Sequence, residues 1–339
     1  MLKRRIILPI VILVAGLLIS ACGSTGGNSG SQSTQGSQVD GGETSSQEPV
    51  TIRVGMVCGG ITPLLAQIAI NDGSLEEAGL DVEKVCFNAG ADAVQALVGG
   101  SLDVNLGSFE HVLRQQKNGL NVKAFGEIAE GVGYSLVVKK DAPYQSLADL
   151  KGTTLAVTKV GSLSDTGLRE GLKLAGLDPD KDVEIISSGS GATMFAAIDS
   201  GKVAGGMVSS PTIQQMVMSG DYRVLYEPDF PYAGIIAMAN ADWVEEHKEA
   251  MKTFFRVLAE VNERAQQDPD AAAEAVAADF SQIEPEVLKA AVRDQLAVVP
   301  EGLKISQAAA DKVMETQIEL GAIDGPIPFD QAVDLSLLP

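Results

Sequence analysis

A short unit occurs twice in this chain, and it limits the possible folds more than any other feature. The first copy is ALVGGSLDVNLGS, from Ala96 to Ser108, and the second is AIDSGKVAGGMVS, from Ala197 to Ser209. Each copy reads as the end of a helix closed by glycine, then a short apolar strand and a terminal serine. Two halves built around the same unit predict two α/β lobes whose strand ends face one cleft.

Strands and helices alternate through both halves. Apolar residues in 52–56 alternate with polar or small ones, and residues 80–85 repeat the pattern, which predicts two strands with a helix between them. In the second half a predicted strand over 154–158 precedes a helix over 163–175, which Gly176 ends. This alternation predicts an α/β protein with mostly parallel sheets flanked by helices.

The first residues predict export and attachment to lipid. Basic residues at positions 3–5 precede an apolar run over 6–19, which is shorter than the roughly 18–20 residues of a membrane-spanning helix. Small residues then precede Cys22, as in a lipobox, where the cysteine is acylated and becomes the mature N-terminus. We therefore expect residues 1–21 to be a lipoprotein signal peptide. The alternative is a plain secretory signal with an incidental cysteine.

Residues 22–49 are dominated by Gly, Ser, Thr, Gln and Asn. Such a segment buries too little apolar surface to fold, so we expect a flexible linker between the bilayer and the folded body. The formal net charge of the chain is −20, and it becomes more negative once the basic leader is removed. Nucleic acids and anionic lipid surfaces both require basic patches, so we expect neither to be bound. The acidic surface is better explained as keeping an exported protein soluble.

Few residues are suited to metal binding or catalysis. His111 and His247 are the only histidines, and neither has a partner at metal-binding spacing, so we expect no metal site and no cofactor. No nucleophile motif is present, so we expect no catalytic residue. Cys58 and Cys86 follow neighbouring predicted strands. Export permits a disulfide between them, but the spacing does not require one, and two free buried thiols are the default expectation.

Two loops that lead from strands into helices are candidates for ligand binding. Exposed N–H groups and the helix dipole at such loops favour an anionic or carbonyl-rich group, although the glycines of the first could equally serve a tight turn. Thr62 precedes proline and reads as a helix N-cap. In the second loop Ser162 and Asp165 fit a capping box, with Asp165 turned back onto its own helix, yet the hydroxyls there could also donate to an oxyanion. The candidates are Gly59, Gly60, Thr62, Ser162, Ser164 and Thr166.

The ends of the repeated unit supply a second set of candidates. Serines at these ends would lie on opposing lobes and could both donate to one ligand. Tyr134 and Tyr232 could form aromatic walls or simply pack where the chain passes between lobes. Ser190 lies between glycines in a turn that resembles a phosphate cradle, but no lysine follows as a nucleotide site would require. This set comprises Ser108, Phe109, Tyr134, Ser190, Ser209, Ser210 and Tyr232.

Further motifs extend along the chain: GSLEEAGLDV from Gly73, DLKG from Asp149, and PF followed by VDLS from Pro328. With the repeated unit, they make residues 51–339 resemble the ABC-transporter solute-binding proteins of the nitrate/sulfonate/taurine group, which includes binders of thiamine precursors. One departure is Ala204, at a position where such proteins usually have Asp.

The resemblance implies a two-lobe type II periplasmic-binding-protein fold with the ligand cleft between the lobes. Lobe 1 would combine residues 51–140 with 230–339, and lobe 2 would be 141–229, with crossings near Lys140 and Asp229.

The resemblance also implies a monomeric receptor, outside the cytoplasm and lipid-anchored to the cell membrane through Cys22. It would capture a small organic anion by lobe closure and deliver it to an ABC permease. A different solute, a heteroaromatic compound of the thiamine-precursor type, would be held by Phe109, Tyr134, Phe230 and Tyr232 with Glu110 and Glu227 nearby. The same fold could also serve an exported sensor or an enzyme.

Overall fold

The computed structural model describes residues 49–339. The predicted signal peptide, Cys22 and the linker up to residue 48 lie outside the described residues. Across residues 49–339 we find no helix whose length and apolar character together would let it cross a bilayer.

Two five-stranded sheets organise the described residues, and the first has the strand order β2-β1-β3-β10-β4. Strands β2, β1 and β3 are parallel, whereas β10 runs antiparallel to both of its neighbours. The strands of this sheet are β1 Val50–Val57, β2 Leu80–Phe87, β3 Val104–Gly107, β4 Val122–Ala129 and β10 Ile235–Asn240.

The second sheet has the order β7-β6-β8-β5-β9 and repeats the directions of the first. The two strands that the repeated unit predicts, β3 and β8, each occupy the central place of their sheet. Its strands are β5 Ser135–Lys139, β6 Thr154–Val157, β7 Glu184–Ser187, β8 Gly205–Val208 and β9 Tyr222–Tyr226.

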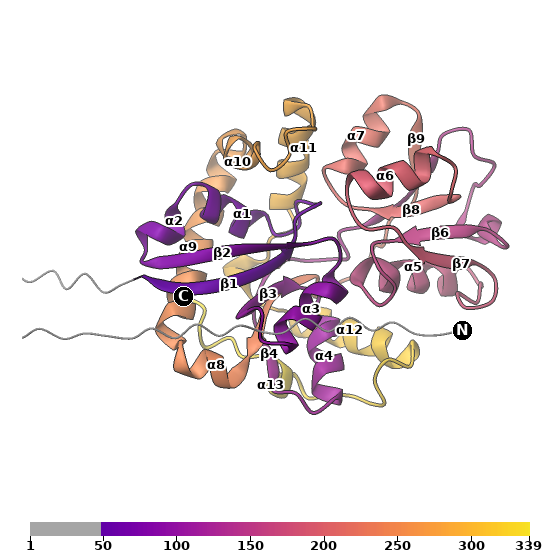
Figure 1. Cartoon of the computed structure of the whole chain (residues 1–339). Coiled ribbons are helices and arrows are strands. Elements are labelled where there is room, and N and C mark those ends of the chain that lie inside the picture. The colour runs from indigo at the N-terminus through magenta and orange to yellow at the C-terminus, as the bar shows by residue number, and fades with distance from the viewer. Residues whose placement is uncertain (1–48) are drawn as a thin grey trace, which may run out of the picture. The chain divides into compact units, whose positions relative to one another are not determined.

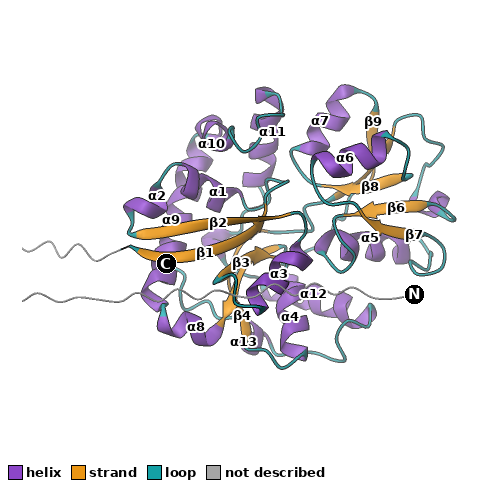
Figure 2. Cartoon of the chain, viewed as in Figure 1, coloured by secondary structure: helices purple, strands orange, loops and turns teal. Residues whose placement is uncertain are grey.

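Helices flank both faces of each sheet (Figure 2). The predicted α/β fold with two mostly parallel, helix-covered sheets is therefore confirmed. Before β10 the helices are α1 Leu64–Asn71, α2 Ser74–Glu77, α3 Gly90–Val98, α4 Phe109–Lys117, the 3-10 helix η1 Leu147–Leu150, α5 Leu163–Leu174, α6 Ala192–Asp199 and α7 Thr212–Ser219. After β10 follow α8 Ala241–Glu246, α9 Lys248–Gln267, α10 Pro269–Val276, α11 Pro285–Leu296, the 3-10 helix η2 Glu301–Leu303, α12 Gln307–Glu319 and α13 Phe329–Ala332.

The chain passes between the two sheets twice, through residues 130–134 and 227–234. In Figure 1 the indigo-to-purple and the orange-to-yellow segments gather around the first sheet, and the pink segment forms the second. The first crossing comes earlier than the position near Lys140 expected from the sequence, because β5 pairs with β8 and β9 of the second sheet. The three central residues of β5, Leu136 to Val138, are apolar and fit a buried place in either sheet, so the sequence carries no sign of which sheet it joins.

One hydrophobic core is continuous from the first sheet into the second. It includes Met56 and Leu106 of the first sheet, Val132 and Tyr134 of the first crossing, and Leu155 of the second sheet. A smaller cluster around Met194 and Met216 fills the other face of the second sheet. Apolar packing thus extends across the junction where the two sheets meet.

Cys58 and Cys86 form a disulfide, which corrects the default expectation of two free buried thiols. Parallel pairing of β1 with β2 places Met56 opposite Cys86, so Cys58 follows two residues beyond on the adjacent strand. Cys86 is exposed and Cys58 half-buried, so neither is a core residue. Only strand register, which the sequence does not display, brings the two sulfur atoms together. The bond holds the loop that carries Gly59 and Gly60 against β2.

Replacing both cysteines by serine should lower the free energy of unfolding by about 3.6 kcal/mol, the chain-entropy value for a loop of this length; the cysteines are 28 positions apart. Urea unfolding of the double variant beside the wild-type chain measures this. Reductant should destabilise the wild type similarly and leave the variant unchanged. Native, unreduced protein in which Cys58 and Cys86 both react with a thiol reagent would contradict the prediction.

A second stability prediction concerns Glu127 of β4, whose side chain is fully buried. Burial raises its pKa to about 8, and nearby Glu130 adds to the rise, although the Gly234 N–H donates to Glu127 Oε1 at 2.9 Å and opposes it. The usual pKa of this carboxyl is near 4.5. Between pH 4.5 and about pH 8, Glu127 therefore holds a proton in the folded protein that it has lost in the unfolded chain. Stability therefore falls as pH rises through this window and is level above it.

Glu127→Gln should remove this dependence, because the amide keeps the shape and the acceptor for Gly234 without a charge. We expect the variant to match the wild type near pH 4.5 and to exceed it by about 4 kcal/mol near pH 8.5. Urea unfolding at both pH values measures the difference. A difference that is the same at both would show that Glu127 does not titrate in this range.

Candidate ligand site between the lobes

Three helices begin at one small enclosed cavity between the two sheets. The N-terminal ends of α3, α4 and α5 bring Gly90, Ser108 and Ser162 to its wall. The cavity volume is about 20 Å³, which is room for about one water molecule. Because helix N-termini carry unpaired N–H groups and the positive end of the helix dipole, the three ends together favour a negative charge here.

Two buried polar atoms on this wall have no hydrogen-bond partner, Ser108 Oγ and His111 Nε2. Both residues are only 2% exposed. Ser108 is the N-cap of α4 and His111 lies in its first turn, so both side chains are at the same end of this helix. Buried polar atoms nearly always have partners, and these two are placed to bond a ligand that enters the cavity.

His111 is uncharged at neutral pH in this arrangement. Burial, and secondly the charge of Arg114 one turn along α4, lower its pKa to about 3. In the tautomer with hydrogen on Nε2, the neutral ring donates one hydrogen bond toward the cavity. Burial likewise raises the pKa of Tyr134 to about 12, so its phenol keeps its proton and can also donate.

Thr62 lines the cavity and does not cap its helix, contrary to the prediction. Helix α1 begins at Leu64 with Pro63 as the N-cap, and no side chain makes a capping hydrogen bond there. Thr62 is 6% exposed and contributes its side chain to the cavity wall. No Asp, Glu, Lys or Arg belongs to the lining of this cavity, so an anion would meet hydrogen-bond donors and helix dipoles without an opposing carboxylate.

Two hydrogen bonds join the two lobes directly near the cavity. The Ala91 N–H of α3 donates to Ser162 Oγ at 3.0 Å, and the Ile61 N–H donates to the Ser210 carbonyl at 2.9 Å. Ser162 therefore serves the opposite lobe, and its predicted capping box with Asp165 does not form. Asp165 does turn back as predicted, since it accepts the Gly161 N–H at 2.8 Å and pairs with Arg169.

Two glycines make the close approach of the lobes possible. A Cβ on Gly59 would lie 2.3 Å from Ser190 Oγ, and one on Gly60 would lie 2.6 Å from Ser209 Oγ. Both serines belong to the second lobe. A side chain at either glycine would therefore hold the lobes apart, and the glycines have a role in lobe contact that a simple turn does not explain.

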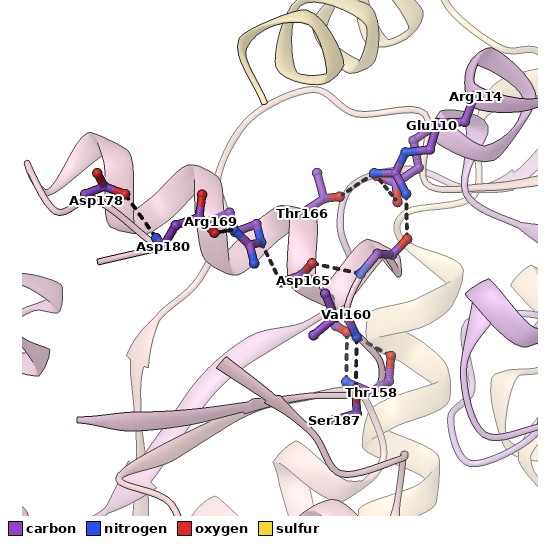
Figure 3. A network of polar contacts seen from close by, with 12 residues as sticks. Glu110, Arg114, Thr158, Val160, Asp165, Thr166, Arg169, Asp178, Asp180 and Ser187 are labelled. Carbon is purple, nitrogen blue, oxygen red and sulfur yellow. Dashed lines mark hydrogen bonds and ion pairs between the residues drawn. The ribbon is translucent and has the colours of Figure 1, made fainter. Parts of the chain in front are cut away.

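Arg114 of α4 bridges the lobes on the other side (Figure 3). Its guanidinium donates to the Gly161 carbonyl at 2.6 Å and to Thr166 Oγ1 at 3.4 Å, both in the second lobe. Within its own lobe Arg114 lies 3.5 Å from the fully buried Glu110 carboxylate. Glu110 also accepts a hydrogen bond from the Tyr232 hydroxyl at 2.9 Å.

The structure brings only some of the predicted residues to the cavity. Its wall contains Thr62, Ser108, Tyr134 and Ser162. Ser164 bonds the Thr158 N–H within its own loop, and Thr166 accepts from Arg114. The remaining candidates contact the opposite lobe or the core: Gly59, Gly60, Phe109, Ser190, Ser209, Ser210 and Tyr232. Ser108 and Ser209 consequently do not share this cavity.

Seven of the eleven lining residues were not among the candidates, and two of these bear on ligand binding, His111 and Gly90. A signal for His111 was present, because it stands three positions after Ser108, which was itself a candidate. Gly90 begins α3, and a Cβ added there would lie 3.4 Å from His111 Nε2. In residues 49–339 no group of three or more His, Cys, Asp and Glu side chains is arranged to hold a metal ion.

Comparison with known proteins gives matches along most of the chain. Residues 61–272 match the sequence profile described as NMT1/THI5 like. A binding protein of Brucella abortus (strain 2308) is 28% identical over 233 residues, which are 65% of this chain and 69% of the Brucella protein.

Two solved structures share the fold. The alkanesulfonate-binding protein SsuA of Xanthomonas axonopodis pv. citri, bound to MOPS, superposes with a TM-score of 0.69 at 19% identity, over 85% of this chain and 99% of SsuA. The periplasmic nitrate-binding protein NrtA of Synechocystis PCC 6803 gives 0.67 at 15% identity, over 86% and 87% of the two chains. Both show that the fold is that of the periplasmic binding proteins.

Proposed function

The chain belongs to the NMT1/THI5-like family, and from this membership and the cavity between its lobes we propose that it is the solute-binding component of an ABC importer. It acts outside the cytoplasm, anchored to lipid through Cys22, and binds a small organic or inorganic anion of the sulfonate, nitrate or carboxylate type. Lobe 1 is formed by the segments before and after the two crossings, and lobe 2 by the segment between them.

The observation that carries this proposal is the pair of buried, unpartnered atoms Ser108 Oγ and His111 Nε2 at a cavity where three helices begin. A neutral polar ligand would satisfy these atoms, but it would gain nothing from the three helix dipoles. A carboxylate, sulfonate or nitrate gains from both. Its oxygens would accept hydrogen bonds from Ser108, His111 and Tyr134.

The size of the cavity indicates how the solute enters. At about 20 Å³ it holds no more than one water molecule, so any of these anions requires the lobes to separate first. The contacts of Ser162 and Ser210 with the opposite lobe then re-form around the bound group. A ligand that touches both lobes stabilises the closed arrangement by its differential affinity for it, and we propose that the closed form delivers the solute to the permease.

The heteroaromatic solute finds less support at this cavity. Of its aromatic set, Phe109 and Tyr232 lie in the core, and the Tyr232 hydroxyl already donates to Glu110. Tyr134 alone of that set lines the cavity. A binding role agrees with the family and with both structural neighbours, whose names describe binding proteins.

Thermal-shift measurements on the full chain test the proposal with ethanesulfonate, taurine, nitrate and acetate. Ethanol and ethanolamine serve as controls that lack the anionic group, and a 4-aminopyrimidine represents the heteroaromatic solute. At least one anion should raise the melting temperature with the concentration dependence of RT ln(1 + [L]/Kd). If no anion does so, the assignment fails. A rise with the pyrimidine alone would replace it with the heteroaromatic solute.

A further inference from the structure

A second hollow adjoins the central cavity, and Tyr134 contributes to the walls of both. This hinge groove has a volume of about 510 Å³, within the range of small-molecule sites. It is built from the two crossings, from α7 of the second lobe and from α11 of the first, helices that lie side by side in Figure 1. Both lobes therefore contribute to its walls.

The hinge groove is lined by apolar side chains that remain open to solvent. Val217, Met218, Val224 and Val298 are 41%, 63%, 37% and 39% exposed. They are four of the ten exposed large apolar side chains in residues 49–339. Single exposed apolar residues are ordinary on protein surfaces, but a cluster of them in a concave site marks a binding surface.

The charge of the hinge groove is negative. Glu130, Glu227 and Asp294 contribute to its lining, which contains no Lys, Arg or His. In the part of the chain that the structure describes, none of these three carboxylates forms an ion pair. A concave apolar wall with like-charged groups concentrates the opposite charge, so the groove favours a cation.

Two glutamines that line the groove have buried polar atoms without a hydrogen-bond partner. Gln295 is 7% exposed and its Nε2 donor has no partner. Gln214 Nε2 donates to Ser210 Oγ at 2.9 Å and to Asp294 Oδ2 at 3.1 Å. Gln214 Oε1 is buried without a partner. An unused amide donor calls for an oxygen acceptor on whatever occupies the groove.

We propose that the hinge groove is a second binding site, for a small aliphatic amine that carries a hydroxyl or carbonyl oxygen. Its ammonium group lies among Glu130, Glu227 and Asp294, its carbon chain lies on the valines and Met218, and its oxygen accepts from Gln295. The central cavity favours an anion and this groove favours a cation, so the two sites take different molecules.

Because the groove is formed by both lobes, its occupant also influences the central cavity. A ligand that bridges α7 and α11 stabilises the arrangement of the lobes in which those helices adjoin. Affinity for the anion should then rise when the amine is bound, and the reverse must hold to the same degree. This coupling, unlike the site itself, rests on the proposed function.

Isothermal titration of the full chain with 6-amino-1-hexanol tests the site, with hexan-1-ol and ammonium chloride as probes that each lack one feature. We expect measurable binding of the amino alcohol and at least tenfold weaker binding of the two probes. The double variant Glu227→Gln/Asp294→Asn should bind the amino alcohol at least tenfold more weakly than the wild type. Glu246→Gln, an exposed carboxylate on α8 outside the groove, is the matched control and should change nothing.

Absence of amino-alcohol binding would overturn the proposal. Equal affinity for the amino alcohol and hexan-1-ol, or unchanged affinity in the double variant, would overturn it too. Unchanged melting curves of the variants exclude loss of fold as the cause. All of these titrations are done with chloride as the counter-ion and without any of the anions of the thermal-shift screen, so their outcome is independent of that screen and separates failure of the groove from failure of the proposed function.

Discussion

Gly59→Val is expected to weaken solute binding at least 100-fold while leaving each lobe folded. An added Cβ at this position would lie 2.3 Å from Ser190 Oγ, 3.0 Å from Ser190 Cβ and 3.3 Å from the backbone nitrogen of Gly191. The serine hydroxyl can rotate away, but the backbone of Gly191 cannot. A branched side chain at residue 59 therefore keeps the second lobe from reaching its closed position. The ligand then loses its contacts with Ser162 and Leu163, and the cavity opens to water.

Gly325→Val is the matched control for this substitution. An added Cβ at Gly325 meets no atom within 4 Å, and its backbone is outside the left-handed region. The control should bind the solute like the wild type, by titration with the anion found in the thermal-shift screen. Wild-type affinity in Gly59→Val would mean that binding does not require the lobe contact, and the closure mechanism would have to be abandoned.

Ser108→Ala should have opposite effects on binding and on stability. Its hydroxyl is buried without a partner, and it makes no capping hydrogen bond to α4, so alanine removes a desolvated group and no interaction. The melting temperature without ligand should stay level or rise. Affinity for the anion should fall 10- to 100-fold, because a hydrogen bond to a charged group contributes roughly 1.5–3 kcal/mol.

Thr316→Val separates the two effects. Thr316 of α12 is likewise fully buried with an unpartnered hydroxyl, but it does not belong to the cavity. Its replacement should resemble Ser108→Ala in stability and leave the affinity unchanged. If Ser108→Ala binds the anion as tightly as Thr316→Val does, then Ser108 does not contact the solute.

Local patterns in the sequence were sufficient for the alternation of strands and helices and for the relation between the two halves. The repeated unit correctly predicts the strands β3 and β8, because an apolar strand between a glycine and a serine needs no distant information. Their position at the centre of each sheet depends on pairing with distant strands and comes from the structure. The predicted helix over 163–175 corresponds to α5. Strand β5 was assigned to the wrong sheet, since its apolar residues fit a buried position in either one.

The candidate site was predictable in kind but not in detail. Hydroxyls and glycines at helix starts do surround the cavity, and four of the predicted residues line it. Which hydroxyl faces a ligand depends on what else is near it. Ser162 accepts the Ala91 N–H from the other lobe, whereas Ser164, two residues later, is occupied by Thr158.

The sequence by itself determined the order of elements, the two related halves and the general location of the site at strand ends. These follow from periodicity and from residues close together in the chain, where each backbone preference acts within a few positions. The leader with Cys22 stays a prediction. The tertiary structure decided the Cys58–Cys86 bond, the exposure of His111 to the cavity, and the hinge groove between α7 and α11. Each of these depends on strand register or on packing between segments far apart in the chain, which no local pattern encodes.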